Sequence, residues 1–140
     1  MIFGIICEFN PFHKGHRYLI ESVKKENDFV ICAMSGNFVQ RGEFAVYDKY
    51  TRAKTAVENG ADIVIEIPGV CSTLSAQGYA KAGVKILEGT GICDSIAFGA
   101  ECENVDELRA VADKIKEKDA QIKAELAKGV SYPTARRNAV

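Results

Sequence analysis

The two histidines of this chain lie three residues apart, in a segment with the features of a phosphate site. His13 and His16 enclose Lys14 and Gly15, between an apolar run and a helical pattern. His16 falls in the first turn of the expected helix, where free backbone N–H groups and the helix dipole favour an anion. Gly15 lets the backbone approach a ligand closely. We expect His13 and His16 to be catalytic residues that donate hydrogen bonds to phosphate and stabilise the charge of a transfer reaction.

Two other interpretations of this histidine pair remain open. One or both imidazoles could serve only to cap the helix or to pack. A zinc site would need a third ligand, and the nearest acidic residue is Glu8. A spacing of three also differs from the i, i+4 spacing that aligns two ligands on one helix face. We therefore expect no metal site built by the protein, and Mg²⁺ only with a nucleotide, held by phosphates and water.

The elements around the pair alternate between strands and helices. Apolar runs predict four strands, over residues 1–7, 29–34, 62–67 and 93–99. Helical spacing of apolar residues follows each strand, at residues 19–23, 50–57, 79–87 and 105–115. This order predicts an α/β fold, a Rossmann-like parallel sheet with helices on both faces. Ligands bind such sheets beyond the carboxyl ends of the strands, so we expect the site among residues 8–16, 35–42 and 98–101.

Local signals indicate where several helices begin and end. The second helix, with Tyr50, Ala53 and Val57 as its apolar positions, is expected to end at Asn59 and Gly60, since glycine favours the residue that follows a helix. Asn104, followed by Glu107, resembles a capping box that opens a later helix. A charged helical stretch covers residues 119–128, and the tail that follows has little periodicity. We expect one domain over residues 1–140, in which residues 102–140 are a helical extension and tail.

Composition and charge narrow the class of protein. The chain is 47% hydrophobic and 26% charged, which is ordinary globular composition. A formal net charge of −1 gives no overall basic footprint, so a contact with nucleic acid must come from a local patch or from parts outside this chain. The longest apolar runs are too short to span a membrane, and no signal peptide is visible.

The cysteines favour a reduced protein. Their number is odd and they form no CxxC pair, so free buried thiols are expected rather than disulfides or zinc ligands. The five positions are Cys7, Cys32, Cys71, Cys93 and Cys102. We expect a cytoplasmic protein.

Several segments resemble a known family. Residues 11–16 are similar to the H-x-G-H signature of the nucleotidyltransferase superfamily that includes class I aminoacyl-tRNA synthetases. Three longer strings, residues 4–16, 34–68 and 98–101, together resemble the bacterial tRNA(Met) cytidine acetate ligases. The similarity covers about residues 1–101.

This resemblance implies a two-step reaction. Such ligases activate acetate with ATP to give acetyl-adenylate and pyrophosphate, and the acetyl group then passes to N4 of the wobble cytidine in elongator tRNA(Met). The resemblance implies that ATP, with its Mg²⁺, contacts one continuous segment and a glycine after the fourth strand. These residues are Cys7, Glu8, Phe9, Asn10, Pro11, Phe12, His13, Lys14, Gly15, His16, Arg17, Tyr18, Leu19, Ile20 and Gly99.

The loop after the second strand offers further candidates for contacts with substrate or RNA. Three could reach the nucleotide or acetate: Ser35, Gly36 and Asn37. Two could reach pyrophosphate or RNA: Gln40 and Arg41. Lys49, Arg52 and Lys54 could form a basic patch for tRNA phosphates, although each basic side chain could equally be solvated on a helix face. Asp48 and Asp62 are expected to be helix caps or strand-end residues, without a catalytic role.

The same residues leave other functions open. Members of the resembled family are considerably longer, and the late basic motif that holds the outer phosphates in the superfamily is not visible here. We therefore expect a truncated chain whose tRNA-binding region lies elsewhere. One alternative is a small-molecule adenylyltransferase acting on nicotinate mononucleotide or pantetheine phosphate. The other is a nucleotide-binding module without turnover.

Overall fold

The computed structural model describes residues 1–40, 42–101 and 104–139. The chain divides into two compact units, Met1–Gly99 and Ala100–Val140. Each unit is described by itself below.

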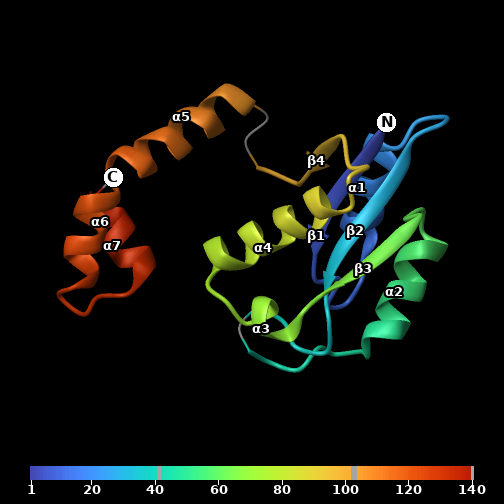
Figure 1. Ribbon diagram of the computed structural model, residues 1–140, viewed down its shortest axis with the longest axis horizontal. Coiled ribbons are helices and arrows are strands. Elements are labelled where there is room, and N and C mark those ends of the chain that lie inside the picture. Colours follow the sequence, from blue (N-terminus) through green and yellow to red (C-terminus); the bar gives the residue numbers. More distant parts are fainter. Residues whose placement is uncertain (41, 102–103, 140) are drawn as a thin grey trace. The chain divides into compact units, whose positions relative to one another are not determined.

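The first unit is built on a four-stranded parallel sheet (Figure 1). Its strands are β1 (Ile2–Cys7), β2 (Phe29–Ser35), β3 (Ile63–Ile67) and β4 (Ser95–Ala97), in the order β3-β2-β1-β4. All three pairings are parallel, as the alternation of strands and helices predicts. β4 is shorter than expected. Just before it, the Asp94 carboxylate accepts the Ile2 N–H at 2.7 Å and the Asp94 N–H donates to the Ile2 carbonyl at 2.9 Å.

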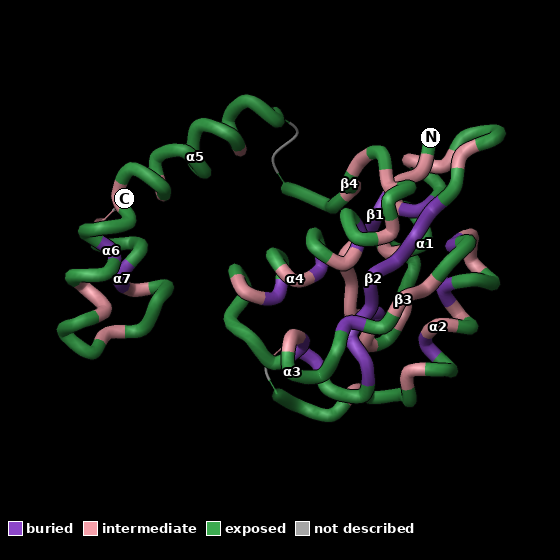
Figure 2. The backbone as a smooth tube through the Cα atoms, viewed as in Figure 1, coloured by how far each residue is buried: buried purple, intermediate pink, exposed green. Residues whose placement is uncertain are grey.

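Helices cover both faces of this sheet, as predicted. They are α1 (Lys14–Val23), α2 (Lys49–Glu58), α3 (Gly69–Ser72) and α4 (Ala76–Gly89). Successive side chains of a strand point to opposite faces, so β2 contributes to two cores: Val30, Cys32 and Met34 pack with α1 and α2, and Ile31 and Ala33 with α4. Figure 2 shows β2 buried along most of its length. The short helix α3 was not predicted, because four residues are too few to show a period.

The ends of α2 are as expected, but its buried face is not. The Asp48 carboxylate caps the helix by accepting the N–H groups of Tyr50 and Thr51, and Gly60 follows it with a φ of 108°. The predicted apolar position Tyr50 is 75% exposed, whereas Arg52 is 2% exposed. The helix is therefore rotated by about one residue from the orientation that its apolar side chains predict.

Asp62 is a strand-end residue, as expected. Its carboxylate accepts the Val30 N–H at 2.8 Å and the Lys24 ammonium at 2.7 Å. These bonds hold the start of β3 against β2 and the end of α1.

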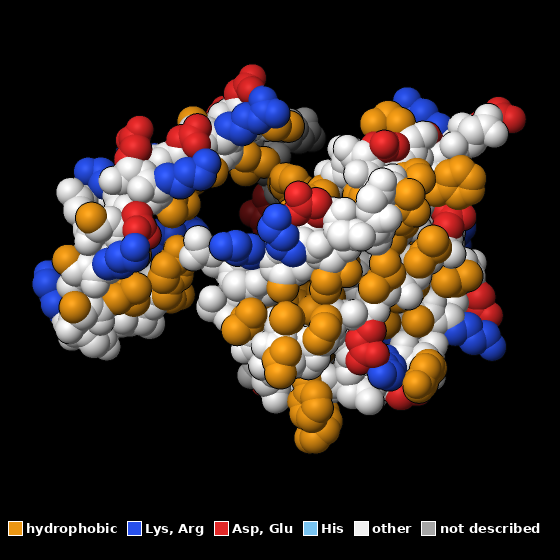
Figure 3. All heavy atoms as spheres, in the orientation of Figure 1, with side chains coloured by type: hydrophobic (Ala, Val, Ile, Leu, Met, Phe, Trp, Pro, Cys, Tyr) orange, Lys and Arg blue, Asp and Glu red, His pale blue; other side chains and the backbone are white. Residues whose placement is uncertain are grey.

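The described part of the second unit, residues 100–101 and 104–139, contains three helices. They are α5 (Val105–Glu117), α6 (Asp119–Leu126) and α7 (Tyr132–Ala139). Asn104 caps α5 by accepting the N–H groups of Asp106 and Glu107. Lysine and arginine alternate with acidic residues on the visible surface of this unit (Figure 3), and ion pairs join neighbours within α5 and within α6.

Helix α7 lies in the tail for which the sequence predicts no element. Its only buried residue is Ala135. A helix that buries so little of its surface needs few apolar side chains, so its sequence has little of the apolar period that indicates a helix. Proline in the first turn of a helix, here Pro133, is compatible with helical backbone. The Asn138 amide also donates to the Glu125 carboxylate of α6, so tertiary contacts within the unit support this helix.

The structure shows the state of four of the five cysteines and the lengths of the described helices. The four described cysteines are free; Cys32 is buried and Cys7, Cys71 and Cys93 are half-buried, so the expectation of burial is confirmed for Cys32 alone among them. Cys102 lies outside the described residues. Within residues 1–40, 42–101 and 104–139, no helix is both long and apolar enough to cross a membrane.

Candidate functional site

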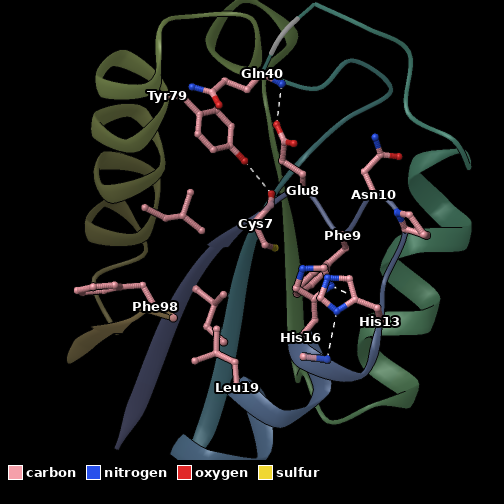
Figure 4. Close-up of a pocket in the computed structure, with 15 residues that line it drawn as sticks. Cys7, Glu8, Phe9, Asn10, His13, His16, Leu19, Gln40, Tyr79 and Phe98 are labelled. Atoms are coloured by element: carbon pink, nitrogen blue, oxygen red, sulfur yellow. Dashed lines mark hydrogen bonds between the residues drawn. The ribbon is translucent and has the colours of Figure 1, made fainter. Parts of the chain in front are cut away.

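A cavity of about 650 Å³ opens at the carboxyl ends of β1 and β4 (Figure 4). The chain runs from β1 through β2 to β3 on one side, and then crosses to β4 on the other side of β1. The cavity therefore lies at the topological switch point, where ligands bind in open α/β sheets. Its lining residues are Ile5, Ile6, Cys7, Glu8, Phe9, Asn10, Pro11, His13, Gly15, His16, Leu19, Gln40, Tyr79, Phe98 and Gly99.

The two histidines form a reciprocal cap at the start of α1. His13 is the N-cap residue, and its Nδ1 accepts the Gly15 N–H at 3.1 Å. The Nδ1 of His16 accepts the His13 N–H at 3.2 Å. The rings stack with their centroids 3.6 Å apart. Both imidazoles therefore cap the helix, and both also line the cavity.

This cap determines where the imidazole protons lie. A neutral imidazole that accepts at Nδ1 carries its proton on Nε2, so Nε2–H is the remaining donor of each ring. Burial, and secondly the charge of His13, lower the pKa of His16 below its usual 6.5. A protonated ring would carry a hydrogen on Nδ1 and lose its cap. The fold thus favours a neutral His16 that donates one hydrogen bond and accepts none from a ligand.

The turn between β1 and α1 positions this pair. Phe9 is 1% exposed and adopts a φ of +46°, and its ring lies 4.9 Å from that of His16. Phe12 also packs against His16, with ring centroids 5.6 Å apart. The apolar rings fix the orientation of His16 and account for its desolvation.

Two side chains of this turn join it to the loop after β2. The Glu8 carboxylate accepts the Gln40 N–H at 2.6 Å, and the Asn10 amide oxygen accepts the Val46 N–H at 2.6 Å. Gln40 is thereby held at the cavity, where Figure 4 shows it beside Glu8.

A buried tyrosine of α4 lies under the cavity. The Tyr79 hydroxyl donates to the Cys7 carbonyl at 2.8 Å and accepts from the Ser35 hydroxyl at 3.0 Å. Burial raises the pKa of Tyr79 to about 12, so the phenol is a neutral donor at physiological pH. Burial likewise raises the pKa of the Cys7 thiol, which disfavours a reactive thiolate.

The structure brings most of the predicted nucleotide residues together. Ten of the fifteen line the cavity: Cys7, Glu8, Phe9, Asn10, Pro11, His13, Gly15, His16, Leu19 and Gly99. Of the other five, Phe12 and Ile20 pack in the core, and Lys14, Arg17 and Tyr18 are exposed outside the lining.

The residues of the loop after β2 that were predicted to contact substrate or RNA do not gather at one site. Gln40 lines the cavity, but Ser35 is fully buried and bonded to Tyr79. Gly36 is buried, and the Asn37 amide oxygen accepts the Lys49 N–H at 3.1 Å. Arg41 lies outside the described residues.

Arg52 requires a correction. Its guanidinium, predicted to contact substrate or RNA, is 2% exposed and donates to three backbone carbonyls, those of Tyr47, Glu8 and Gly36. No surface remains for an RNA phosphate. Because its positive charge made it resemble a surface residue, the sequence did not indicate this role.

Two lining aromatic residues were missed. Tyr79 reads in the sequence as an ordinary apolar position of a helix, and nothing there connects it to a site. Phe98 belongs to the quoted string at residues 98–101 and is 65% exposed, so its place next to Gly99 was the available signal.

Among the described residues, no group of three or more His, Cys, Asp or Glu side chains is arranged to hold a metal.

The fold and the histidine cap define a class of protein. Residues 1–140 match the HIGH Nucleotidyl Transferase family, and the chain belongs to this family. The resemblance inferred from the sequence motifs is thereby confirmed at the level of the family.

Individual relatives within this family carry more specific names. The tRNA(Met) cytidine acetate ligase of Acetivibrio thermocellus is 46% identical over 99% of this chain, and that of Lysinibacillus sphaericus is 48% identical over 93%. A crystal structure of Thermotoga maritima TmcAL bound with alpha-thio ATP superposes with a TM-score of 0.86 and 40% identity over 99% of this chain. The chain spans only about a third of these relatives, 35%, 34% and 35% of their lengths.

Proposed function

We propose that the cavity binds ATP and that this chain is the nucleotide-binding part of a tRNA(Met) cytidine acetate ligase. The observation that carries the proposal is the reciprocal histidine cap at a switch-point cavity. The similarity to a structure bound with alpha-thio ATP supports the nucleotide, and the names of the relatives support the acceptor.

The proposed first step is attack of an acetate carboxylate oxygen on the α-phosphorus of ATP. A new oxygen–phosphorus bond forms, the bond to the bridging oxygen breaks, and pyrophosphate leaves. The Nε2–H groups of His13 and His16, at the positive end of the α1 dipole, would donate to the phosphate oxygens. Positioning and electrostatics of this kind dominate phosphoryl chemistry.

In the proposed second step the N4 amine of cytidine attacks the acetyl carbonyl. The new carbon–nitrogen bond forms, AMP leaves, and the amine loses a proton. The RNA surface for this step is not concentrated in the predicted basic patch, because Lys49 is paired with Glu66 at 2.6 Å and Arg52 is buried.

The rest of the cavity suits the nucleoside and its counter-ion. Phe98 offers an exposed ring beside Gly99, a combination that suits an adenine or ribose lying against bare backbone. Glu8 is the only carboxylate among the described lining residues. A single carboxylate fits Mg²⁺ held mainly by phosphates and water, and the ion would neutralise phosphate charge.

ATP–pyrophosphate exchange tests the proposal. We expect exchange that depends on acetate, and a fall of about a hundredfold to a thousandfold for His16→Ala, since one preorganised donor is lost. Lys85→Ala serves as the control, because Lys85 is exposed and paired with Glu88 on its own helix. Exchange with a phosphorylated acceptor in place of acetate would instead favour a small-molecule adenylyltransferase. Binding of ATP without any exchange would favour a module without turnover.

A further inference from the structure

The turn that precedes the histidines holds a residue in an unfavourable conformation. Phe9 has a φ of +46°, in the left-handed region that is unfavourable for a residue with a side chain. Such a conformation persists only where the surroundings determine it. Burial of the Phe9 ring is one such constraint, and the peptide groups on either side of Glu8 supply the others.

Those peptide groups are held from both faces of the sheet. On the α4 side, the Tyr79 hydroxyl donates to the Cys7 carbonyl at 2.8 Å. On the α2 side, Nη1 of Arg52 donates to the Glu8 carbonyl at 2.5 Å. The carbonyls of two successive residues, directly before Phe9, are therefore fixed by side chains that come from distant parts of the chain.

The same guanidinium also binds the loop after β2. Its Nη2 donates to the Gly36 carbonyl and its Nε to the Tyr47 carbonyl at 3.0 Å. Gly36 and Tyr47 enclose the loop that carries Gln40. One buried side chain thus joins the turn that presents the histidines to both ends of the loop that presents Gln40.

The partners of this guanidinium are carbonyl oxygens, and among the described residues it forms no ion pair. Burial lowers the pKa of Arg52, as expected for a charge removed from water. Burying a charge is unfavourable unless it is well hydrogen-bonded. The three bonds leave three different nitrogen atoms of the planar guanidinium. The ammonium of lysine also has three donors, but they radiate from one nitrogen and do not reproduce this spacing.

We propose that Arg52 is a positioning residue for the nucleotide site. It holds the turn at Glu8 and Phe9 against the loop between Gly36 and Tyr47, so that the histidine pair and Gln40 face one cavity. This inference rests on the proposed nucleotide site, but the geometry of His16 gives it a readout that needs no nucleotide.

The first experiment removes and restores the guanidinium. In Arg52→Ala we expect the affinity for a nonhydrolysable ATP analogue, measured by calorimetry, to fall at least about tenfold, and the rate of pyrophosphate exchange to fall by about a hundredfold. Millimolar guanidinium chloride should restore both, because a cavity of about 210 Å³ lined in part by Arg52, Thr51 and Thr55 offers it a path. Methylammonium chloride should not.

The second experiment measures the site without nucleotide. Because Phe9 and Phe12 desolvate His16 only while the turn is held, the lowered pKa of His16 should return toward 6.5 in Arg52→Ala. Nuclear magnetic resonance titration of the imidazole reads this directly, and guanidinium should reverse the change. Lys85→Ala is the matched control, in which both the titration and the affinity should equal those of the wild type.

Arg52→Lys covers the case in which Arg52→Ala does not fold. This variant keeps the charge but not the three-way geometry, so a folded protein with weaker nucleotide binding and a raised His16 pKa is expected. Wild-type values of both quantities in Arg52→Lys, or in a folded Arg52→Ala, would overturn the proposal. If the wild type itself failed to bind ATP, the proposed function would fail, while the His16 titration would still decide the role of Arg52.

Discussion

At the scale of single residues, the helix cap formed by the two imidazoles is compatible with the catalytic role that the sequence presents as its alternative. The Nδ1 atoms of His13 and His16 cap α1, and this cap leaves Nε2–H as the donor available to a ligand. Because Nδ1 of each ring accepts a backbone N–H, the proton of the neutral ring lies on Nε2, which can donate to a ligand. A histidine that caps a helix is not, for that reason, excluded from catalysis.

The pH dependence of stability follows from the lowered pKa of His16. Between its unfolded value near 6.5 and the lower folded value, the unfolded chain binds more protons than the native one. The free energy of unfolding is therefore expected to fall as pH decreases through this range. Urea unfolding at several values between about pH 7 and about pH 5 measures this slope. The slope should be smaller in His16→Gln, and an unchanged slope there would contradict the assignment.

The hydroxyl of Tyr79 gives a second prediction at this scale. Tyr79→Phe leaves the Cys7 carbonyl and the buried Ser35 hydroxyl without this partner. We expect a loss of about 1–3 kcal/mol in the free energy of unfolding, measured with urea. Tyr18→Phe is the control, because Tyr18 is 72% exposed and should change stability by less than about 0.5 kcal/mol. Equal effects of the two changes would show that the buried hydroxyl contributes nothing.

At the scale of elements, the site depends on how closely α4 and α2 approach β1. Tyr79 and Arg52 come from these two helices, which cover opposite faces of the sheet. Each helix therefore contributes to the core and also places one polar side chain at the end of β1. The identity of both helices is predictable from the sequence, but the rotation of α2 is not, since Arg52 occupies the buried face that Tyr50 was expected to share.

The contact of α4 with β1 can be tested at a glycine. A Cβ at Gly83 would lie 2.7 Å from Cγ2 and 2.8 Å from Cγ1 of Ile6. Gly83→Ala is therefore expected to destabilise the protein by about 1–3 kcal/mol through overpacking. Gly89→Ala on the same helix meets nothing within 4 Å and should be neutral or stabilising by up to about 1 kcal/mol. Thermal unfolding of the two variants compares them, and a stable Gly83→Ala would show that the helix can move away from the strand.

At the scale of the whole molecule, the described residues that line the cavity come from one compact unit. These lining residues lie within Met1–Gly99, as do the four strands found in the described part of the chain. The second unit has its own small core, in which Ile122 and Ala135 are buried. The fragment Met1–Gly99 therefore contains every described residue that lines the proposed nucleotide site.

This division predicts the behaviour of a fragment. Residues 1–99 alone are expected to bind a nonhydrolysable ATP analogue with an affinity within about threefold of that of the 140-residue chain. Calorimetric titration of both proteins makes the comparison, and the His16→Ala fragment is the control for binding at this site. Loss of binding in a folded fragment would show that the second unit contributes to the site.

The sequence by itself determined the alternation of the four strands with their longer helices, the parallel sheet and the segment that carries the histidines. These are local properties: apolar period, helix-start residues and glycine positions depend on neighbours within a few residues. Only the tertiary structure decided that Tyr79 reaches Cys7, 72 positions away, and that Arg52 reaches Glu8, 44 positions away. A charge or a phenol in one helix carries no local sign of the carbonyl it will meet, because packing sets the rotation of each helix and brings distant segments together.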